Sequence, residues 1–307
     1  MRVVFMGSPD FSIPTLTELA RLHEVVGVVT QPDRPAGRGR QTKASVVKQF
    51  AIGHGLRVIE PESLRAPQSV GQLAGLRPDL IVVAAYGQIL PQPVLELSPH
   101  GCLNVHASLL PRWRGASPVQ AAILHGDSVT GVTIMLMDAG LDSGPILAQR
   151  ATPITASETG GSLGLRLARL GADLLIEVLP AHLAGDLRPA VQDEARVTHA
   201  PRLKKASGLI DLLLPAEHLA RQVRALQPWP GTYLQWNGRR LLVHAARAAP
   251  MDNLAPGQAF ELERLPAVGT GAGALVLERV QPDGKRAMDG YAFLLGSPDF
   301  LDARLLG

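Results

Sequence analysis

Short runs of mostly apolar, β-branched residues alternate with amphipathic segments along the first part of the chain. The runs at residues 2–6, 25–29 and 79–84 are each bounded by turn-forming residues, which predicts buried parallel strands. Between them, residues 44–51 place apolar side chains on one helical face, and residues 14–22 open with a proline, which suits the first turn of a helix. This alternation of strand and helix predicts an open α/β sheet.

The pattern continues with one more strand and one long helix. Residues 131–137 predict a strand, and the turn after it carries Asp138 and Asp142. Ligands bind beyond the carboxyl ends of strands in open α/β sheets, so we expect these carboxylates near a ligand. Residues 162–183 repeat leucine at helical spacing and predict the long helix that closes the first domain.

Regular patterning fades after residue 186, where polar, basic and proline residues gather. We therefore predict a first domain at residues 1–189, a linker at 190–207 and a second domain at 208–307. The second domain begins with a predicted helix at 216–226, and Asn237-Gly238 then signals a tight hairpin. Later glycine-rich turns continue the pattern of a small β barrel, which we interpret as an auxiliary substrate module.

Composition narrows the class of protein. The 307 residues exceed one ordinary core, and 46% apolar content suffices to bury two, which predicts a folded, soluble protein. Cys102 is the only cysteine, which excludes an internal disulfide framework and fits a reducing compartment, so we expect a cytoplasmic protein. No run reaches membrane-spanning length, and the histidines outside the segment discussed below show no metal-ligand spacing, so we predict no metal.

The charge is mildly basic and locally clustered. The formal net charge is +3, which by itself does not indicate nucleic-acid binding. One cluster occupies a loop rich in glycine and proline and contains Arg34, Arg38, Arg40 and Lys43. The other lies in the predicted linker and contains Arg202, Lys204 and Lys205. Taken alone, each cluster is as consistent with a solvated charge run as with a contact to nucleic acid.

The most informative segment is GCLNVHASLLPRWRGASP at residues 101–118. Asn104 and His106 are two residues apart, so on a strand they would face the same side and offer an amide donor and a proton carrier. If the fold brings Asp142 to His106, its carboxylate could hold one imidazole tautomer and leave the other ring nitrogen free for a reacting oxygen. Such a site suits acyl or formyl transfer.

Competing interpretations of this segment are structural or thiol-based. An isolated Asn-x-His is more often structural, but a loop with proline and two arginines around a tryptophan is poor core material. Cys102 shares the strand parity of Asn104 and His106 and could be a catalytic thiol. No basic residue adjoins it in sequence to activate it, so we interpret Cys102 as a small packed residue.

Two further loops follow predicted strands. The segment Gly7–Phe11 contains a single glycine and a proline that lacks an N–H, which argues against a phosphate cradle and hence against a dehydrogenase. In Tyr86–Pro91, a glycine would let backbone groups approach a flat ligand closely, although a plain loop is nearly as consistent.

Five segments of the chain resemble the methionyl-tRNA formyltransferases, a branch of the 10-formyltetrahydrofolate-dependent formyltransferase family. They are FMGSPDF, VVTQPDRPAGRGR, AAYGQILP, GCLNVHASLLPRWRGASPVQAAI and GVTIMLMDAGLDSGPIL, and the similarity covers nearly the whole chain. The Asn, His and Asp segments are shared by the whole family, whereas QPDRPAGRG and LQPWPGTYL are more specific to the tRNA branch. The resemblance implies a Rossmann-like, catalytic first domain and an OB-like, tRNA-binding second domain.

The resemblance also implies roles for individual residues. The catalytic positions are Asn104, His106 and Asp142. The folate-binding positions are Tyr86, Gly87, Gln88, Ile89, Leu90, Ser108, Leu109, Leu110, Pro111 and Asp138. The tRNA-binding positions are Arg34, Arg38, Arg40, Lys43, Arg202, Lys204 and Lys205, among which Arg38 matches the loop arginine that contacts the acceptor stem. The chain departs from the family after the lysines, where Ala206-Ser207-Gly208 replaces an acidic pair.

The reaction that the resemblance implies uses 10-formyltetrahydrofolate as formyl donor and initiator methionyl-tRNA as acceptor. We expect a monomer that needs no metal and no membrane. A formyltransferase acting on an amino sugar nucleotide is the alternative, against which QPDRPAGRGR argues. An inert tRNA-binding protein on the same fold would need a broken catalytic trio, and here the trio is intact.

Overall fold

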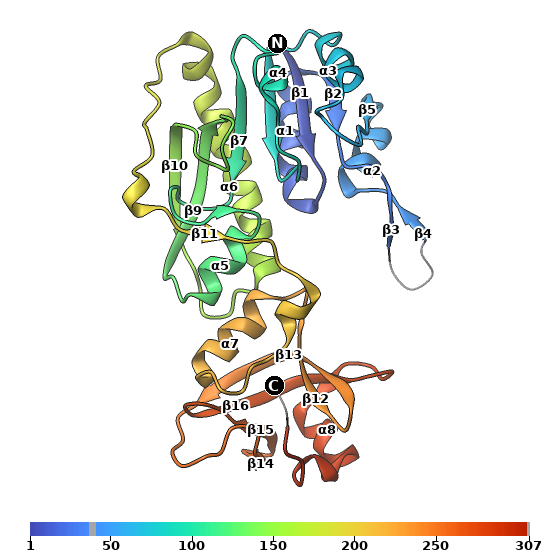
Figure 1. The fold of residues 1–307 in the computed structure, drawn as a ribbon, viewed down its shortest axis with the longest axis vertical. Coiled ribbons are helices and arrows are strands. Elements are labelled where there is room, and N and C mark those ends of the chain that lie inside the picture. The colour runs from blue at the N-terminus through green and yellow to red at the C-terminus, as the bar shows by residue number, and fades with distance from the viewer. Residues whose placement is uncertain (37–40, 306–307) are drawn as a thin grey trace. The chain divides into compact units, whose positions relative to one another are not determined.

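The computed structural model describes residues 1–36 and 41–305, with the side chains of 34–36 and 41–43 left undescribed. The chain divides into two compact units (Figure 1). Unit 1 comprises Met1–Pro118, Val129–Pro153 and Gly164–Pro201, and unit 2 comprises Val119–Ser128, Ile154–Leu163 and Arg202–Gly307. In the described part of the chain, no helix combines the length and the apolar character needed to cross a membrane.

Unit 1 is built on a seven-stranded sheet with the order β10-β9-β7-β6-β1-β2-β5. Its strands are β1 (Arg2–Gly7), β2 (Glu24–Val29), β5 (Val58–Ile59), β6 (Leu80–Ala84), β7 (Cys102–His106), β9 (Val129–Leu136) and β10 (Ile146–Pro153). The three apolar runs of the first part are β1, β2 and β6, and they pair in parallel as predicted. Strand β7 extends this parallel set beside β6.

Strand β9 reverses the direction of the sheet. It pairs antiparallel with β7 and with β10, so the turn that carries Asp138 and Asp142 does not lie at the carboxyl edge of a parallel set. We expected these carboxylates near a ligand because we took β9 as a parallel strand, and that assumption is wrong. The physical reason is that a strand buried on both faces shows no alternation, and a continuous apolar run carries no information about strand direction.

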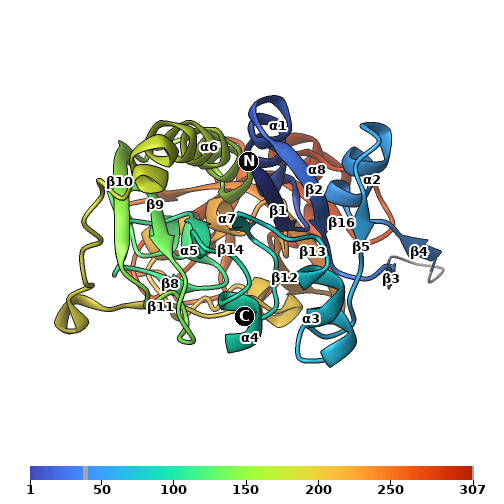
Figure 2. The same cartoon turned by 90° about the horizontal axis from the view of Figure 1, so that it is seen from above.

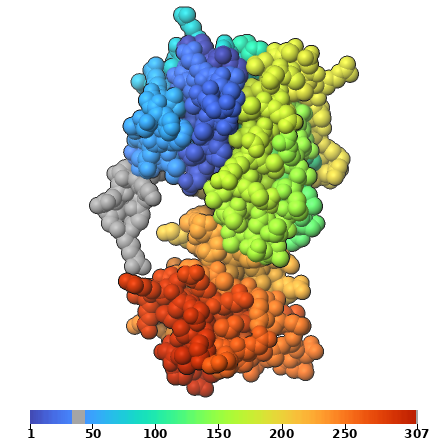
Figure 3. All heavy atoms as spheres, turned by 180° about the vertical axis from the view of Figure 1, so that it is seen from behind, coloured from blue at the N-terminus to red at the C-terminus, as the bar shows by residue number. Residues whose placement is uncertain are grey.

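Helices cover both faces of this sheet. They are α1 (Ile13–Leu22), α2 (Val46–Gly53), α3 (Pro67–Ala74), α4 (Gln92–Leu95) and the part of α6 (Gly160–Ala184) from Gly164 onward, whereas α5 (Pro118–Leu124) lies almost wholly in unit 2. Figure 2 shows α1 and α6 on one face and α3 and α4 on the other. On the face drawn in Figure 3, the surfaces of the α1 and α6 segments lie side by side. Helix α6 packs closely on β7, since a Cβ at Gly171 would lie 2.5 Å from Val105 Cγ1.

Unit 2 contains an antiparallel sheet of six strands. Five of them follow the order β12-β13-β16-β15-β14, and the sixth, β17, pairs with β16. Its elements are α7 (Ala216–Ala225), β12 (Thr232–Trp236), β13 (Arg239–Ala249), β14 (Ala259–Leu262), β15 (Leu265–Gly269), β16 (Ala274–Pro282), β17 (Met288–Asp289) and α8 (Gly290–Gly296). The predicted hairpin joins β12 to β13, with φ of 49° at Asn237 and 70° at Gly238. The expected fold class, an α/β domain followed by a smaller β domain, is confirmed.

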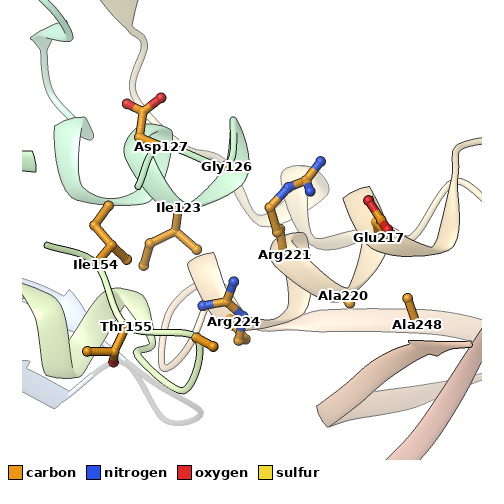
Figure 4. A pocket seen from close by; sticks show the side chains of 11 residues that line it. Ile123, Gly126, Asp127, Ile154, Thr155, Glu217, Ala220, Arg221, Arg224 and Ala248 are labelled. Carbon is orange, nitrogen blue, oxygen red and sulfur yellow. The ribbon is translucent and has the colours of Figure 1, made fainter. Parts of the chain in front are cut away.

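Helix α7 forms hydrogen bonds to the two earlier segments that belong to unit 2, Val119–Ser128 and Ile154–Leu163. Arg221 Nε donates to Leu124 O at 3.2 Å, at the end of α5, and Arg224 Nη1 donates to Glu158 O at 2.8 Å. A cavity of about 330 Å³ lies between these segments. Figure 4 shows the two arginines on α7, with Ile123 and Ile154 also at the cavity. Burial, followed by the charge of Arg221, lowers the pKa of Arg224.

Candidate active site

Strand β7 presents Asn104 and His106 on one side of the sheet, as their spacing predicts. Val105, between them, faces α6 at Gly171, so its two neighbours point to the opposite face. Asn104 is 7% exposed and His106 is 5% exposed. Two polar side chains this deeply buried require partners inside the protein.

Asp142 reaches both side chains from the turn between β9 and β10. Its Oδ1 accepts a long hydrogen bond from Asn104 Nδ2 at 3.4 Å, and its Oδ2 lies 3.7 Å from His106 Nδ1. Gly115 N donates to Oδ2 at 2.8 Å. Asp142 has a φ of 50°, a left-handed conformation that is costly for a residue with a side chain and that the surrounding bonds maintain. The structure thus brings the three predicted catalytic residues together.

The imidazole of His106 is fixed by a backbone carbonyl rather than by the carboxylate. Nε2 lies 3.0 Å from Trp113 O, and a carbonyl only accepts, so Nε2 carries the proton of this bond. The expectation that Asp142 fixes the tautomer and leaves the far nitrogen free is wrong for this geometry. Nδ1 is instead the nitrogen that faces Asp142, at a distance too long for a hydrogen bond.

Gln192 holds the backbone that carries Asp142, although no sequence motif marks this residue. Its Nε2 donates to Asp142 O and to Gly144 O, each at 2.8 Å, and its Oε1 accepts from Arg114 Nε at 3.0 Å. Gln192 is 5% exposed although it falls in the predicted linker. Arg114 also forms an ion pair with Glu194 at 2.8 Å, so the segment from Gln192 to Glu194 lies beside the site.

A short pair of strands keeps this segment in place. Strand β11 (His199–Ala200) pairs in parallel with β8 (Arg114–Gly115). The approach is close, because a Cβ on Gly115 would lie 2.6 Å from Ala200 O. Gly115, whose N–H binds Asp142, is therefore positioned from both sides.

The segment from Ser108 to Pro111, predicted to bind folate, lies against β9. Thr133 Oγ1 donates to Ser108 O at 2.6 Å and accepts from Leu110 N at 3.1 Å. Ser108 and Leu110 are buried, and Ser108 Oγ donates to Arg112 O at 2.5 Å. The segment is thus held by internal bonds, and its folate role stays a prediction. Asp138 is exposed and accepts from Ser143 Oγ at 2.8 Å.

The loop from Tyr86 to Leu90 borders a cavity of about 300 Å³ in unit 1. The lining residues are Gln31, Glu62, Ser63, Leu64, Arg65, Gly87, Gln88 and Ile89. Gln88 Nε2 donates to Pro61 O at 3.2 Å, and Gly87 has a φ of 86°. Tyr86 and Leu90 are buried, and burial raises the pKa of the Tyr86 phenol well above its usual range. The residues 62–65 were missed because nothing in their pattern links them to the loop.

The predicted tRNA-binding residues fall in two places. Arg202, Lys204 and Lys205 are exposed at the start of the last stretch of unit 2. Arg38 and Arg40 lie outside the described residues, as do the side chains of Arg34 and Lys43. The backbone on either side forms a short antiparallel pair, β3 (Arg34–Ala36) with β4 (Gln41–Lys43).

The fold and the Asn–His–Asp cluster, in which Asn104 and His106 are buried and Asp142 is partly exposed, define a two-domain α/β protein with an amide, an imidazole and a carboxylate gathered at one site. Residues 1–179 match the family model "Formyl transferase", and residues 202–298 match "Formyl transferase, C-terminal domain". The chain belongs to the formyl transferase family.

Curated relatives align over nearly the full length. A methionyl-tRNA formyltransferase of Myxococcus xanthus (strain DK1622) is 46% identical over 301 residues, which cover 96% of this chain and 95% of the relative. One from Roseiflexus sp. (strain RS-1) is 49% identical over 292 residues, which cover 94% and 90%.

Solved structures share the fold at lower identity. The structure of HypX from Aquifex aeolicus in complex with tetrahydrofolic acid has a TM-score of 0.65 and 20% identity, and the match covers 97% of this chain and 47% of HypX. WlaRD, a sugar 3N-formyl transferase, has a TM-score of 0.67 and 16% identity, with coverage of 93% and 99%. At these identities the two structures support the fold alone.

Proposed function

We propose that this protein transfers a formyl group from 10-formyltetrahydrofolate to the α-amino group of methionine carried by initiator tRNA. The observation that carries the proposal is the convergence of the buried Asn104 and His106 with the partly buried Asp142 in one cluster. The near-full-length relatives at 46% and 49% identity bear the name methionyl-tRNA formyltransferase, which supports this acceptor.

The chemistry begins with attack of the methionine amine on the formyl carbon. A new C–N bond forms, the carbonyl becomes a tetrahedral oxyanion, and the bond from carbon to N10 of the folate then breaks. The amine loses a proton and N10 gains one, which a water molecule can carry between them. The site must therefore stabilise a transient negative oxygen.

The three residues of the cluster divide this task. Asn104 Nδ2 exchanges its long 3.4 Å bond to Asp142 for a bond to the oxyanion. Because Trp113 O occupies Nε2, His106 donates to the oxyanion from a protonated Nδ1, and the nearby carboxylate of Asp142 stabilises the resulting imidazolium. Loss of one such oxyanion donor costs about a hundred- to a thousandfold in rate.

The formyl donor is best accommodated along the loop from Tyr86 to Leu90. Gly87, with its φ of 86°, gives a backbone without a side chain at this point, and the cavity of about 300 Å³ opens beside it. Backbone groups at such a turn can bind the hydrogen-bonding edge of a flat heterocycle. The acceptor tRNA requires positive charge, and Arg38 with Arg202, Lys204 and Lys205 supply it.

A substrate comparison tests the proposal. Purified protein is incubated with 10-formyltetrahydrofolate and, separately, with methionine-charged initiator tRNA, methionine-charged elongator tRNA and a dTDP-linked amino sugar. We expect rapid formylation of the initiator tRNA and little of the other two. Preferential formylation of the amino sugar would contradict the proposed acceptor while leaving the formyl transfer chemistry in place.

A further inference from the structure

A three-residue ion bridge closes the base of the basic segment 34–43. Lys48 Nζ, in α2, lies 2.7 Å from Asp33 Oδ2 and 2.8 Å from Glu60 Oε2. Asp33 directly precedes β3, and Glu60 directly follows β5. The three side chains are only 19%, 28% and 27% exposed. We call this set, Asp33, Lys48 and Glu60, the Lys48 bridge.

The bridge depends on its one lysine. The second carboxylate oxygens, Asp33 Oδ1 and Glu60 Oε1, are buried and have no hydrogen-bond partner among the described residues. The bonds to Asp33 and then to Glu60 raise the pKa of Lys48, so it stays charged at neutral pH. Without the ammonium group, two negative carboxylates would face each other in a sparsely hydrated space.

Hydrogen bonds between hydroxyl groups also join the residues just before the basic segment to the residues just after it. Thr30 Oγ1 and Ser45 Oγ share a hydrogen bond of 2.7 Å, and Ser8 Oγ lies 3.2 Å from Thr30 Oγ1. Ser45 also caps α2 by accepting from Lys48 N at 3.0 Å. The chain entering the basic segment, at 30–33, is thus bonded to the chain leaving it, at 45–48, through both the hydroxyl pair and the bridge.

We infer that Lys48 is a positioning residue for tRNA use. By joining Asp33 to α2, it fixes the direction in which the β3–β4 pair extends from the rest of unit 1, without contacting the reacting atoms. A segment fixed at both ends has less freedom to lose when it binds, whereas a loosened one must be ordered by the tRNA itself. The inference rests on the proposed tRNA role of segment 34–43.

Steady-state kinetics of Lys48→Met test this inference. With initiator methionyl-tRNA varied at saturating folate, we expect KM for tRNA to rise about tenfold, kcat to change less than about twofold and KM for the folate to stay unchanged. Lys48→Arg keeps the charge and should restore KM to within about threefold of the parent. Lys285→Met removes an exposed lysine of unit 2 and should match the parent.

A second variant covers the case in which Lys48→Met does not fold. The triple variant Asp33→Asn, Lys48→Met, Glu60→Gln removes the bridge and the unpaired charges together. We expect its thermal unfolding temperature to return toward the parent value, while KM for tRNA stays raised. If the folded triple variant had the parent KM, the inference would be overturned.

The remaining outcomes separate this inference from the proposed function. If Arg38→Ala raises KM for tRNA and the Lys48 variants do not, the segment binds tRNA and the bridge does not position it. If neither Arg38→Ala nor the Lys48 variants change tRNA use, the tRNA role of the segment fails as well. A fall in kcat or weaker folate use in folded Lys48→Met would show that the residue acts on the catalytic cluster, which also overturns the inference.

Discussion

Replacing Gln192 by leucine should impair catalysis although this side chain contacts none of the three proposed catalytic side chains. The change deletes two bonds of 2.8 Å to the carbonyls of Asp142 and Gly144, and one of 3.0 Å from Arg114. It leaves these groups without their partner in a region where Gln192 itself is 5% exposed. Each buried polar group left unpaired costs roughly 1–3 kcal/mol.

The effect on rate follows from the conformation of Asp142. Its left-handed φ of 50° needs external support, and Gln192 supplies part of that support through the carbonyl of the same residue. A displacement of about 1 Å in a catalytic group can cost about a hundredfold. We therefore expect kcat for Gln192→Leu to fall by about ten- to a hundredfold, with KM values for tRNA and folate changed much less.

Gln192→Glu serves as the matched variant. It keeps the acceptor for Arg114 but replaces the amide donor with an oxygen that faces two carbonyl oxygens, so it should lose activity as the leucine variant does. Thermal unfolding and single-turnover formylation would be measured for both. A leucine variant with the parent kcat and the parent unfolding temperature would refute the reasoning that Gln192 supports Asp142.

Three further predictions concern tRNA binding and Cys102. Arg38→Ala should raise KM for initiator methionyl-tRNA and leave folate binding unchanged; equal turnover across a range of tRNA concentrations would contradict it. Because phosphate contacts release counterions, tRNA affinity should fall with salt by a log–log slope of about 0.7–0.9 per neutralised phosphate, and the triple variant Arg202→Ala, Lys204→Ala, Lys205→Ala should have a shallower slope. An unchanged slope would remove these residues from the tRNA contact. Burial raises the pKa of Cys102 to about 12, so its thiol stays protonated at neutral pH, and Cys102→Ala should keep kcat within about twofold, measured beside iodoacetamide labelling of the parent.

Much of the fold follows from local pattern, but strand direction does not. The parallel set β1, β2 and β6 was predictable because each apolar run alternates with a helix of clear periodicity. Strand β9 is equally apolar and runs the other way, and its pairing depends on partners far along the chain. Helix α8 was missed because seven residues with glycine at both ends give too little pattern to distinguish a helix from a loop.

The sequence predicts only those parts of the site that depend on one strand or one motif. Strand parity places Asn104 beside His106, and the resemblance adds Asp142. Gln192 was out of reach, because its contacts are 48 and 50 residues away, in a segment with no regular pattern. The partner of His106 Nε2 is a backbone carbonyl, whose direction depends on the left-handed φ of 62° at Trp113, and a tryptophan gives no signal of that conformation.

The central claim is that Asn104, His106 and Asp142 act as one unit in formyl transfer. A double-mutant cycle on His106→Ala and Asp142→Ala, with Asn104→Ala measured alongside, tests it most directly through single-turnover formylation of initiator methionyl-tRNA by folded variants. We predict that each single variant loses most of the rate and that the His106–Asp142 double variant loses little more than the worse single one. A double variant whose loss equals the product of the two single losses would show independent contributions and contradict the claim.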